Sequence, residues 1–173
     1  LGDSVGFRVN GYYVDRDGYI DNLETGNSLN GEEGFGIRGK LVAEIGVADI
    51  TLIADHSERD VLGNAATYLQ LPTGSLFFGN AFDRSGVEVG LGANTIRFDR
   101  DPIADNEQTS LIGKVDIDLG FATLSSVTGY QEWSYQFGQD VDGTDLALIF
   151  QGGPYASKQF SQELRLTSPS ADG

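Results

Sequence analysis

The stretch "FGIRGKLVAEI", residues 35–45, alternates apolar and polar side chains with a period of two residues. In an extended strand, Phe35, Ile37 and Leu41 therefore share one face, whereas Arg38 and Lys40 lie on the opposite face. In the strand expected at 158–168, Glu163 and Arg165 share the polar face in the same way, and a strand buried on both faces seldom places two charges so close together. The polar face must meet water, either as bulk solvent or as a wet interior.

Similar alternation recurs along the chain in stretches of roughly ten residues. The expected strands cover residues 4–15, 34–45, 49–60, 108–118, 121–135 and 158–168. Ile53 and Ile112 are exceptions to the alternation in their strands. Roughly ten residues is the length that a tilted strand needs to cross the hydrocarbon layer of a membrane. Together with 24 glycines and four prolines, this pattern predicts an all-β fold of antiparallel up-and-down strands.

The connections between these strands alternate in length. Short turns are expected at "GVA", residues 46–48, and at "LG", residues 119–120, and long loops at about 16–33, 61–107 and 136–157. Compact soluble domains usually keep their connections to a handful of residues. Short turns on one side and long loops on the other are typical of bacterial outer-membrane barrels. We therefore expect residues 1–173 to form about six strands of a larger transmembrane β-barrel, with a polar lumenal face and a lipid-facing apolar face.

Acidic residues outnumber basic ones, 26 to 11, and the formal net charge is −15. This balance disfavours binding to nucleic acid, whose phosphates are also negative. The three expected long loops hold fourteen of the acidic residues but four of the basic ones, so the strands are closer to neutral. An acidic mouth would favour cationic or metal-bridged ligands, although solubility alone also explains acidic loops.

The composition removes several other classes of protein. The chain has no cysteine and no methionine, even at position 1, so we expect an internal piece or a processed product without disulfides or thiolate metal sites. No run approaches the ~18 apolar residues of a membrane-spanning helix. The absence of such a run excludes membrane-spanning helices but not membrane-spanning strands.

Several longer stretches resemble the mid-barrel of TonB-dependent outer-membrane receptors. They are "VNGYYVDRDGYIDN", "GIRGKLVAE", "GKVDIDLGFATLSSVTGYQEW", the loop containing "QDVDGTD", and "KQFSQELRLTSP". The similarity covers nearly the whole chain except the middle of the segment 61–107, and the order of the stretches matches.

The resemblance implies a barrel of about 22 strands around a globular plug. It also implies a Gram-negative outer membrane, lipid contact, and energy-coupled import of ferric siderophores, cobalamin or glycans through contact of the plug with TonB. No stretch here resembles that plug or an aromatic-terminated closing strand. We therefore expect this chain to be part of a transporter, with a further strand following the last one, and a small-molecule or metal-chelate ligand chosen mostly by residues elsewhere.

Two groups of residues are candidates for binding. "DVDGTD" places Asp140, Asp142 and Asp145 around Gly143, where hard oxygen ligands could converge on calcium. This loop is shorter than an EF-hand loop and lacks its distal Glu, so a solvated Asp/Gly turn is the simpler interpretation.

Aromatic residues cluster near the long-loop end of the fifth expected strand. Tyr130, Trp133 and Tyr135 could stack on a sugar or a siderophore ring, or could anchor the barrel at the membrane interface. Anchoring is the simpler interpretation of the two.

No motif indicates an enzyme. "GFGIRG", residues 34–39, has the spacing of a dinucleotide fingerprint, but it lies within an alternating strand and no helix follows. His56 is the single histidine, so any triad or histidine metal centre would depend on it, and a polar lumen or rim position is expected instead. We expect no catalytic residues and no cofactor other than possible calcium.

Two alternatives to the receptor remain open. Six strands without closing partners expose two edges and an apolar face, so a cleaved fragment could self-associate into an extended or cross-β extracellular filament. A secreted calcium-binding β-sandwich is a further alternative. Against it, Arg and Lys occur on the polar face of the expected strands more often than in a soluble sandwich of this size.

Overall fold

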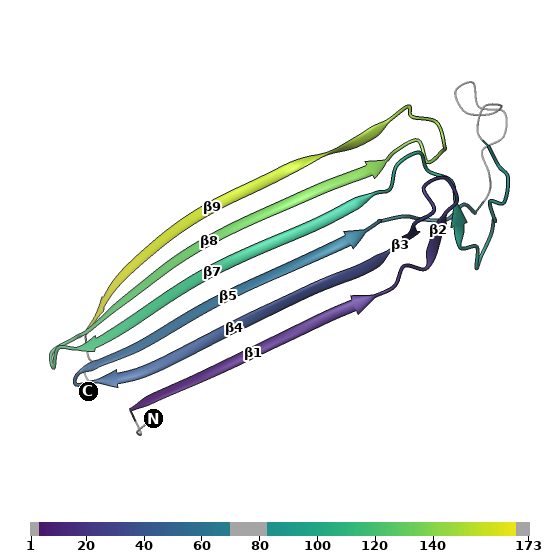
Figure 1. The fold of residues 1–173 in the computed structure, drawn as a ribbon. Coiled ribbons are helices and arrows are strands. Elements are labelled where there is room, and N and C mark those ends of the chain that lie inside the picture. Colours follow the sequence, from purple (N-terminus) through teal and green to yellow (C-terminus); the bar gives the residue numbers. More distant parts are fainter. Residues whose placement is uncertain (1–3, 70–82, 169–173) are drawn as a thin grey trace.

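The computed structural model describes residues 4–69 and 83–168 and shows one long, curved antiparallel sheet (Figure 1). Its six strands, in spatial as well as chain order, are β1 (Val5–Arg16), β4 (Gly31–Ile45), β5 (Ala48–Leu62), β7 (Ile103–Asp118), β8 (Thr123–Asp140) and β9 (Phe150–Thr167). The expected all-β, up-and-down arrangement is thus confirmed. The sheet is not closed into a barrel: within the described residues, β1 and β9 each pair on one side.

The strands extend further into the expected loops than the sequence indicated. β7 begins at Ile103 and β9 at Phe150, several residues earlier than expected, and β8 continues to Asp140. The "QGGP" run at 151–154 predicts a loop, yet Gly152 pairs with Gly138 and Pro154 with Gln136. Pairing with β8 overrides the low strand propensity of these residues, and a proline is tolerated in β9 because this strand has a free edge.

The alignment of each pair of neighbouring strands is constant, and it defines two faces. One row of register partners crosses all six strands as Val9, Gly39, Ala54, Leu111, Tyr130 and Phe160. The next row, on the opposite side, is Asn10, Arg38, Asp55, Ser110, Gln131 and Gln159. We call the first side the apolar face and the second the polar face. Ile53 and Ile112, the exceptions to the alternation, are register partners of each other on the polar face.

The apolar face is divided along the strands. Its part nearest the short turns is an apolar band, formed by Val5, Phe7, Val9, Phe35, Ile37, Leu41, Ile50, Leu52, Ala54, Leu111, Val115, Ile117, Tyr130, Phe160, Leu164 and Leu166. Towards the loops the same face becomes a polar belt of Asp15, Glu33, His56, Glu58, Asp60, Asp105, Glu107, Thr109, Glu132, Ser134 and Lys158. The band is uncovered, since Phe7, Phe160 and Leu164 are 66%, 67% and 69% exposed.

The buried hydrophobic core lies in the loops and not on the sheet. Three short strands, β2 (Ile20–Asn22), β3 (Ser28–Leu29) and β6 (Thr95–Ile96), form a second sheet at the loop end of the molecule (Figure 1). The core cluster of the described residues consists of Ile20, Leu29, Ala65, Ile96 and Phe98, with Tyr68 packed against it. We call this region the loop cap. No helix in residues 4–69 or 83–168 is long and apolar enough to span a membrane.

A buried asparagine connects the segments of the loop cap. The Asn22 side-chain amide donates to the Phe98 carbonyl (3.0 Å) and to Asp101 Oδ1 (2.8 Å). Its Oδ1 accepts the backbone N–H groups of Phe98 (3.0 Å) and Glu24 (3.2 Å). Asn22 is 1% exposed, so nearly its whole hydrogen-bonding capacity is used where water does not reach.

Replacing this residue is expected to loosen the loop cap. Asn22→Ala leaves the Phe98 amide and carbonyl without their partner in a buried site, which we expect to cost about 2–4 kcal/mol of local stability. Hydrogen exchange at the Phe98 amide should become at least tenfold faster. Asn64→Ala, at an exposed position of the same region, is the control and should leave this rate unchanged. Equal exchange rates of the Phe98 amide in the two variants would contradict this role of Asn22.

Candidate functional site

The predicted calcium turn lies between β8 and β9 and is held together by its own carboxylates. Asp140 Oδ1 accepts the Gly143 N–H at 2.9 Å, and Asp142 Oδ2 accepts the Ile149 N–H at 2.9 Å. Asp142 Oδ1 also accepts from the backbone and the hydroxyl of Thr144. Gly143 has φ of 64°, a left-handed conformation that glycine adopts without strain.

The three predicted ligands are not equivalent in the structure. Both Asp142 oxygens are occupied by groups of the turn, and Asp145 Oδ1 accepts the Asp83 N–H at 3.1 Å. Asp140 is 4% exposed, and its Oδ2 has no hydrogen-bond partner in the part of the chain that the structure describes. To bind calcium here, Asp142 would have to give up the hydrogen bonds that it accepts within the turn. The calcium site stays a prediction.

The surroundings of Asp140 oppose its ionisation. Burial raises its pKa to about 7, the neighbouring carboxylates of Asp142 and Asp99 add to the rise, and the Gly143 N–H partly opposes it. Tyr68 donates its hydroxyl proton to the Gly143 carbonyl. Burial and the same acidic surroundings also raise the pKa of Tyr68. The turn is therefore a place where a carboxyl holds its proton near neutral pH.

The protonation of Asp140 can be followed directly. Its carboxyl ¹³C shift should titrate with a midpoint near pH 7, and Asp99→Asn should lower the midpoint because a neighbouring negative charge is removed. Asp145→Asn is the control and should leave the midpoint unchanged. An unfolded aspartate loses its proton at about pH 3.9, so the turn should lose about 4 kcal/mol of stability as pH rises from there through 7. A midpoint near 4 would refute this account.

The three predicted aromatics lie on opposite faces of the sheet. Tyr130 belongs to the apolar band, and its hydroxyl donates to Glu132. Trp133 and Tyr135 lie on the polar face, where their rings stack at 5.9 Å between centroids. Tyr135 also stacks with Phe137 at 6.2 Å and with Tyr155 at 6.3 Å. The three residues thus cannot belong to one girdle, and Trp133 and Tyr135 belong to a row of stacked rings on the polar face.

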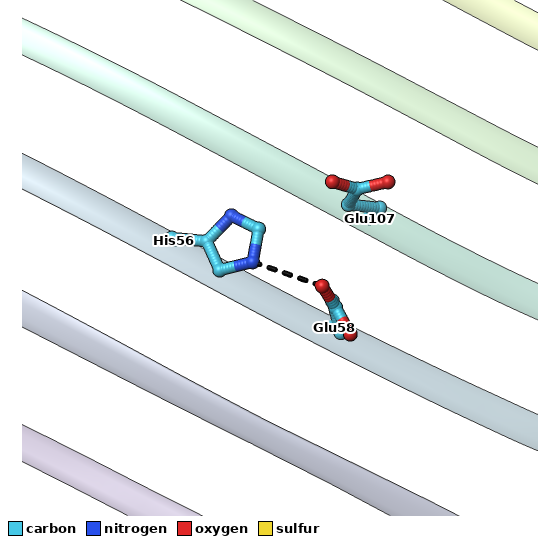
Figure 2. A group of neighbouring side chains, drawn as sticks. All are labelled: His56, Glu58 and Glu107. Atoms are coloured by element: carbon cyan, nitrogen blue, oxygen red, sulfur yellow. Dashed lines mark hydrogen bonds and ion pairs between the residues drawn. The ribbon is translucent and has the colours of Figure 1, made fainter.

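A third group of side chains was not expected from the sequence. His56 and Glu58 project from β5 on the polar belt, and Glu107 projects beside them from β7 (Figure 2). One ligand atom of each lies within 4.8 Å of the other two. His56 Nε2 is 3.1 Å from Glu58 Oε1, and Nδ1 is 2.8 Å from the Thr109 hydroxyl. Within the described residues, no other three His, Cys, Asp or Glu side chains come so close.

Part of this cluster could have been predicted from the sequence. His56 and Glu58 are two residues apart in a predicted strand, which places them on one face. Glu107 is the register partner of Glu58, and that pairing depends on the alignment of β5 with β7 across a connection of 40 residues. Alternation alone does not reveal that alignment.

Comparisons of the chain with protein-family models, with curated proteins and with solved structures give no match. The function is therefore argued from the sheet and its side chains.

Proposed function

We propose that this chain is part of the wall of an outer-membrane β-barrel of the TonB-dependent receptor class, which imports scarce nutrients such as metal chelates, cobalamin or glycans. The observation that carries the proposal is the apolar band, which crosses all six strands while the opposite face of the same strands is mostly polar. A sheet in water would not leave this band open, because each fully exposed Leu or Phe forfeits about 1.5–3 kcal/mol of burial.

The height of the band fits a membrane. On β4, where the apolar residues of this face extend furthest, they run from Phe35 to Ile45, and ten residue steps of an antiparallel strand measure about 33 Å. With strands tilted by about 40°, this length covers about 25 Å of depth, which is the height of the apolar belt of outer-membrane barrels. On β7 and β9 the band is shorter, from Leu111 to Ile117 and from Phe160 to Leu166. Beyond the band, the polar belt would then lie at the level of the lipid headgroups.

The polar face suits a wet interior. A groove on this side is lined by Arg8, Asn10, Tyr12, Arg38 and Asp55. Charged and hydroxyl groups of neighbouring strands bond to one another there, as in Ser110 Oγ to Asp55 at 2.6 Å and Ser125 Oγ to Asp116 at 2.5 Å. The stacked rings of Trp133, Tyr135, Phe137 and Tyr155 lie on the same side nearer the loops, where they could contact a planar ligand entering the barrel.

Single cysteines test the two faces, because the natural chain has none. We expect a fluorophore on Phe160→Cys, in the apolar band, to be quenched several-fold by spin-labelled lipids in membranes that contain the protein. The same fluorophore on Gln159→Cys, the neighbouring residue on the polar face, is the matched control and should be quenched little. Equal quenching at both positions would remove the support for a lipid-facing band.

The two ends of the strands should lie on opposite sides of the membrane. Leu91→Cys, in the long connection between β5 and β7, should react with an impermeant maleimide on intact cells, since Leu91 is 98% exposed. Val47→Cys, in the tight β4–β5 turn, should react after the outer membrane is permeabilised and not before. Reaction of both residues on intact cells would contradict a spanning sheet.

A second candidate function is self-assembly into an extracellular filament, and the open edges of β1 and β9 favour it. Such an assembly would cover the apolar band with other copies of the chain in place of lipid. It predicts detergent-free, concentration-dependent fibres with a repeat of about 4.7 Å along the fibre. The lipid-quenching measurement distinguishes the two functions, because a filament gives no lipid contact at position 160.

A further inference from the structure

We infer that His56, Glu58 and Glu107 form a binding site for a divalent transition-metal ion, and their chemistry favours zinc. An imidazole with two carboxylates is a ligand set that zinc accepts, and three protein ligands leave a fourth position for water. Calcium and magnesium prefer oxygen ligands alone, so the imidazole disfavours them.

The distances allow the three groups to meet at one ion. Ligand atoms bound to a single tetrahedral zinc lie about 3.4 Å apart, because each bond is about 2.0–2.1 Å long. His56 Nε2 and Glu58 Oε1 are already 3.1 Å apart, and all three ligand atoms lie within 4.8 Å of one another. Side-chain rotations that move the Glu107 carboxylate by an ångström or so would complete the site without backbone movement.

The sheet fixes the backbone of the site. His56 pairs with Thr109 and Glu58 pairs with Glu107 across the β5–β7 ladder, so four neighbouring positions form a square on one face. Direct partners of this kind keep their Cβ atoms about 4.5–5.5 Å apart. The ligands therefore come from two strands whose spacing is set by backbone hydrogen bonds (Figure 2).

Thr109 is in position to orient the histidine. Its hydroxyl lies 2.8 Å from His56 Nδ1, and accepting the Nδ1 proton would leave the Nε2 lone pair directed towards the two carboxylates. Metal-binding histidines commonly have such an oxygen partner on their other ring nitrogen. The ring of Phe35, 5.7 Å from that of His56, packs beside it on β4. Thr109 is thus a positioning residue for the site.

The charges around the cluster also favour a cation. Glu58 and Glu107 are directly opposite each other, and like charges at opposed positions destabilise a sheet. The nearest lysine of the polar belt, Lys158, is engaged with Glu132 at 2.7 Å. Within the described residues, Glu107 makes no salt bridge, so its charge opposite Glu58 is not balanced by a side chain of the sheet.

Zinc titration of the chain, prepared without a histidine tag, tests the site. We expect isothermal titration to show one zinc per chain with a Kd of about 1–10 μM, and tetrahedral cobalt absorption on cobalt substitution. His56→Asn and Glu107→Gln should each weaken binding at least tenfold, and Thr109→Val should weaken it about tenfold through loss of orientation. Glu163→Gln, a carboxylate on the polar face of β9, is the control and should bind as the natural chain does.

The outcomes separate this site from the proposed function, because zinc binding uses side chains of β5 and β7 and does not depend on what covers the sheet. All substitutions are on exposed or half-buried positions, and circular dichroism should show the strand content unchanged. Zinc binding that is equal in the natural chain, His56→Asn and Glu107→Gln would place the ion elsewhere and overturn the inference. Absence of binding up to about 1 mM zinc would overturn it as well.

Discussion

The constant alignment of neighbouring strands is the constraint on which the rest of this molecule depends. Each of the five strand pairs keeps a constant offset over its whole length, so no residue changes face between the turns and the loops. A slip of one residue in any pair would move the apolar side chains of that strand to the polar face. The separation of the faces, the apolar band and the His56 cluster all follow from this alignment.

The sequence predicted the features that depend on local pattern and missed those that depend on alignment. Alternation is a local property, so it identified the strands and their two faces, and the alternating lengths of the connections indicated the up-and-down order. In the sequence the exceptions Ile53 and Ile112 looked unrelated, but the register makes them partners on neighbouring strands. The start of β9 was missed because Gly152 and Pro154 have low strand propensity, and the partner strand β8 decides their conformation.

The candidate sites show the same division. The carboxylates of "DVDGTD" were found by their spacing. The raised pKa of Asp140 could not be predicted, since it depends on burial in the fold and on the charge of Asp99, which is far away in sequence. Tyr130 and Trp133 lie on different faces because they are three positions apart along the strand, an odd number, and this could have been predicted from the sequence. Glu107 could not, because its neighbours on β5 are set by pairing.

The loop cap and the turns together hold the register from both ends. The tight turns join β4 to β5 and β7 to β8 at one end, whereas β1 and β4, β5 and β7, and β8 and β9 are joined through the longer connections. Those connections are bonded to one another: the Asn30 N–H donates to the Leu62 carbonyl at 2.6 Å, Asp21 to Asn94 at 2.8 Å, and Asp99 to Thr144 at 3.0 Å. The cap excludes water with its own core, so its packing does not require lipid. The apolar band has no core of its own, so the loop cap fixes the alignment of the strands at their loop end, whatever covers the band.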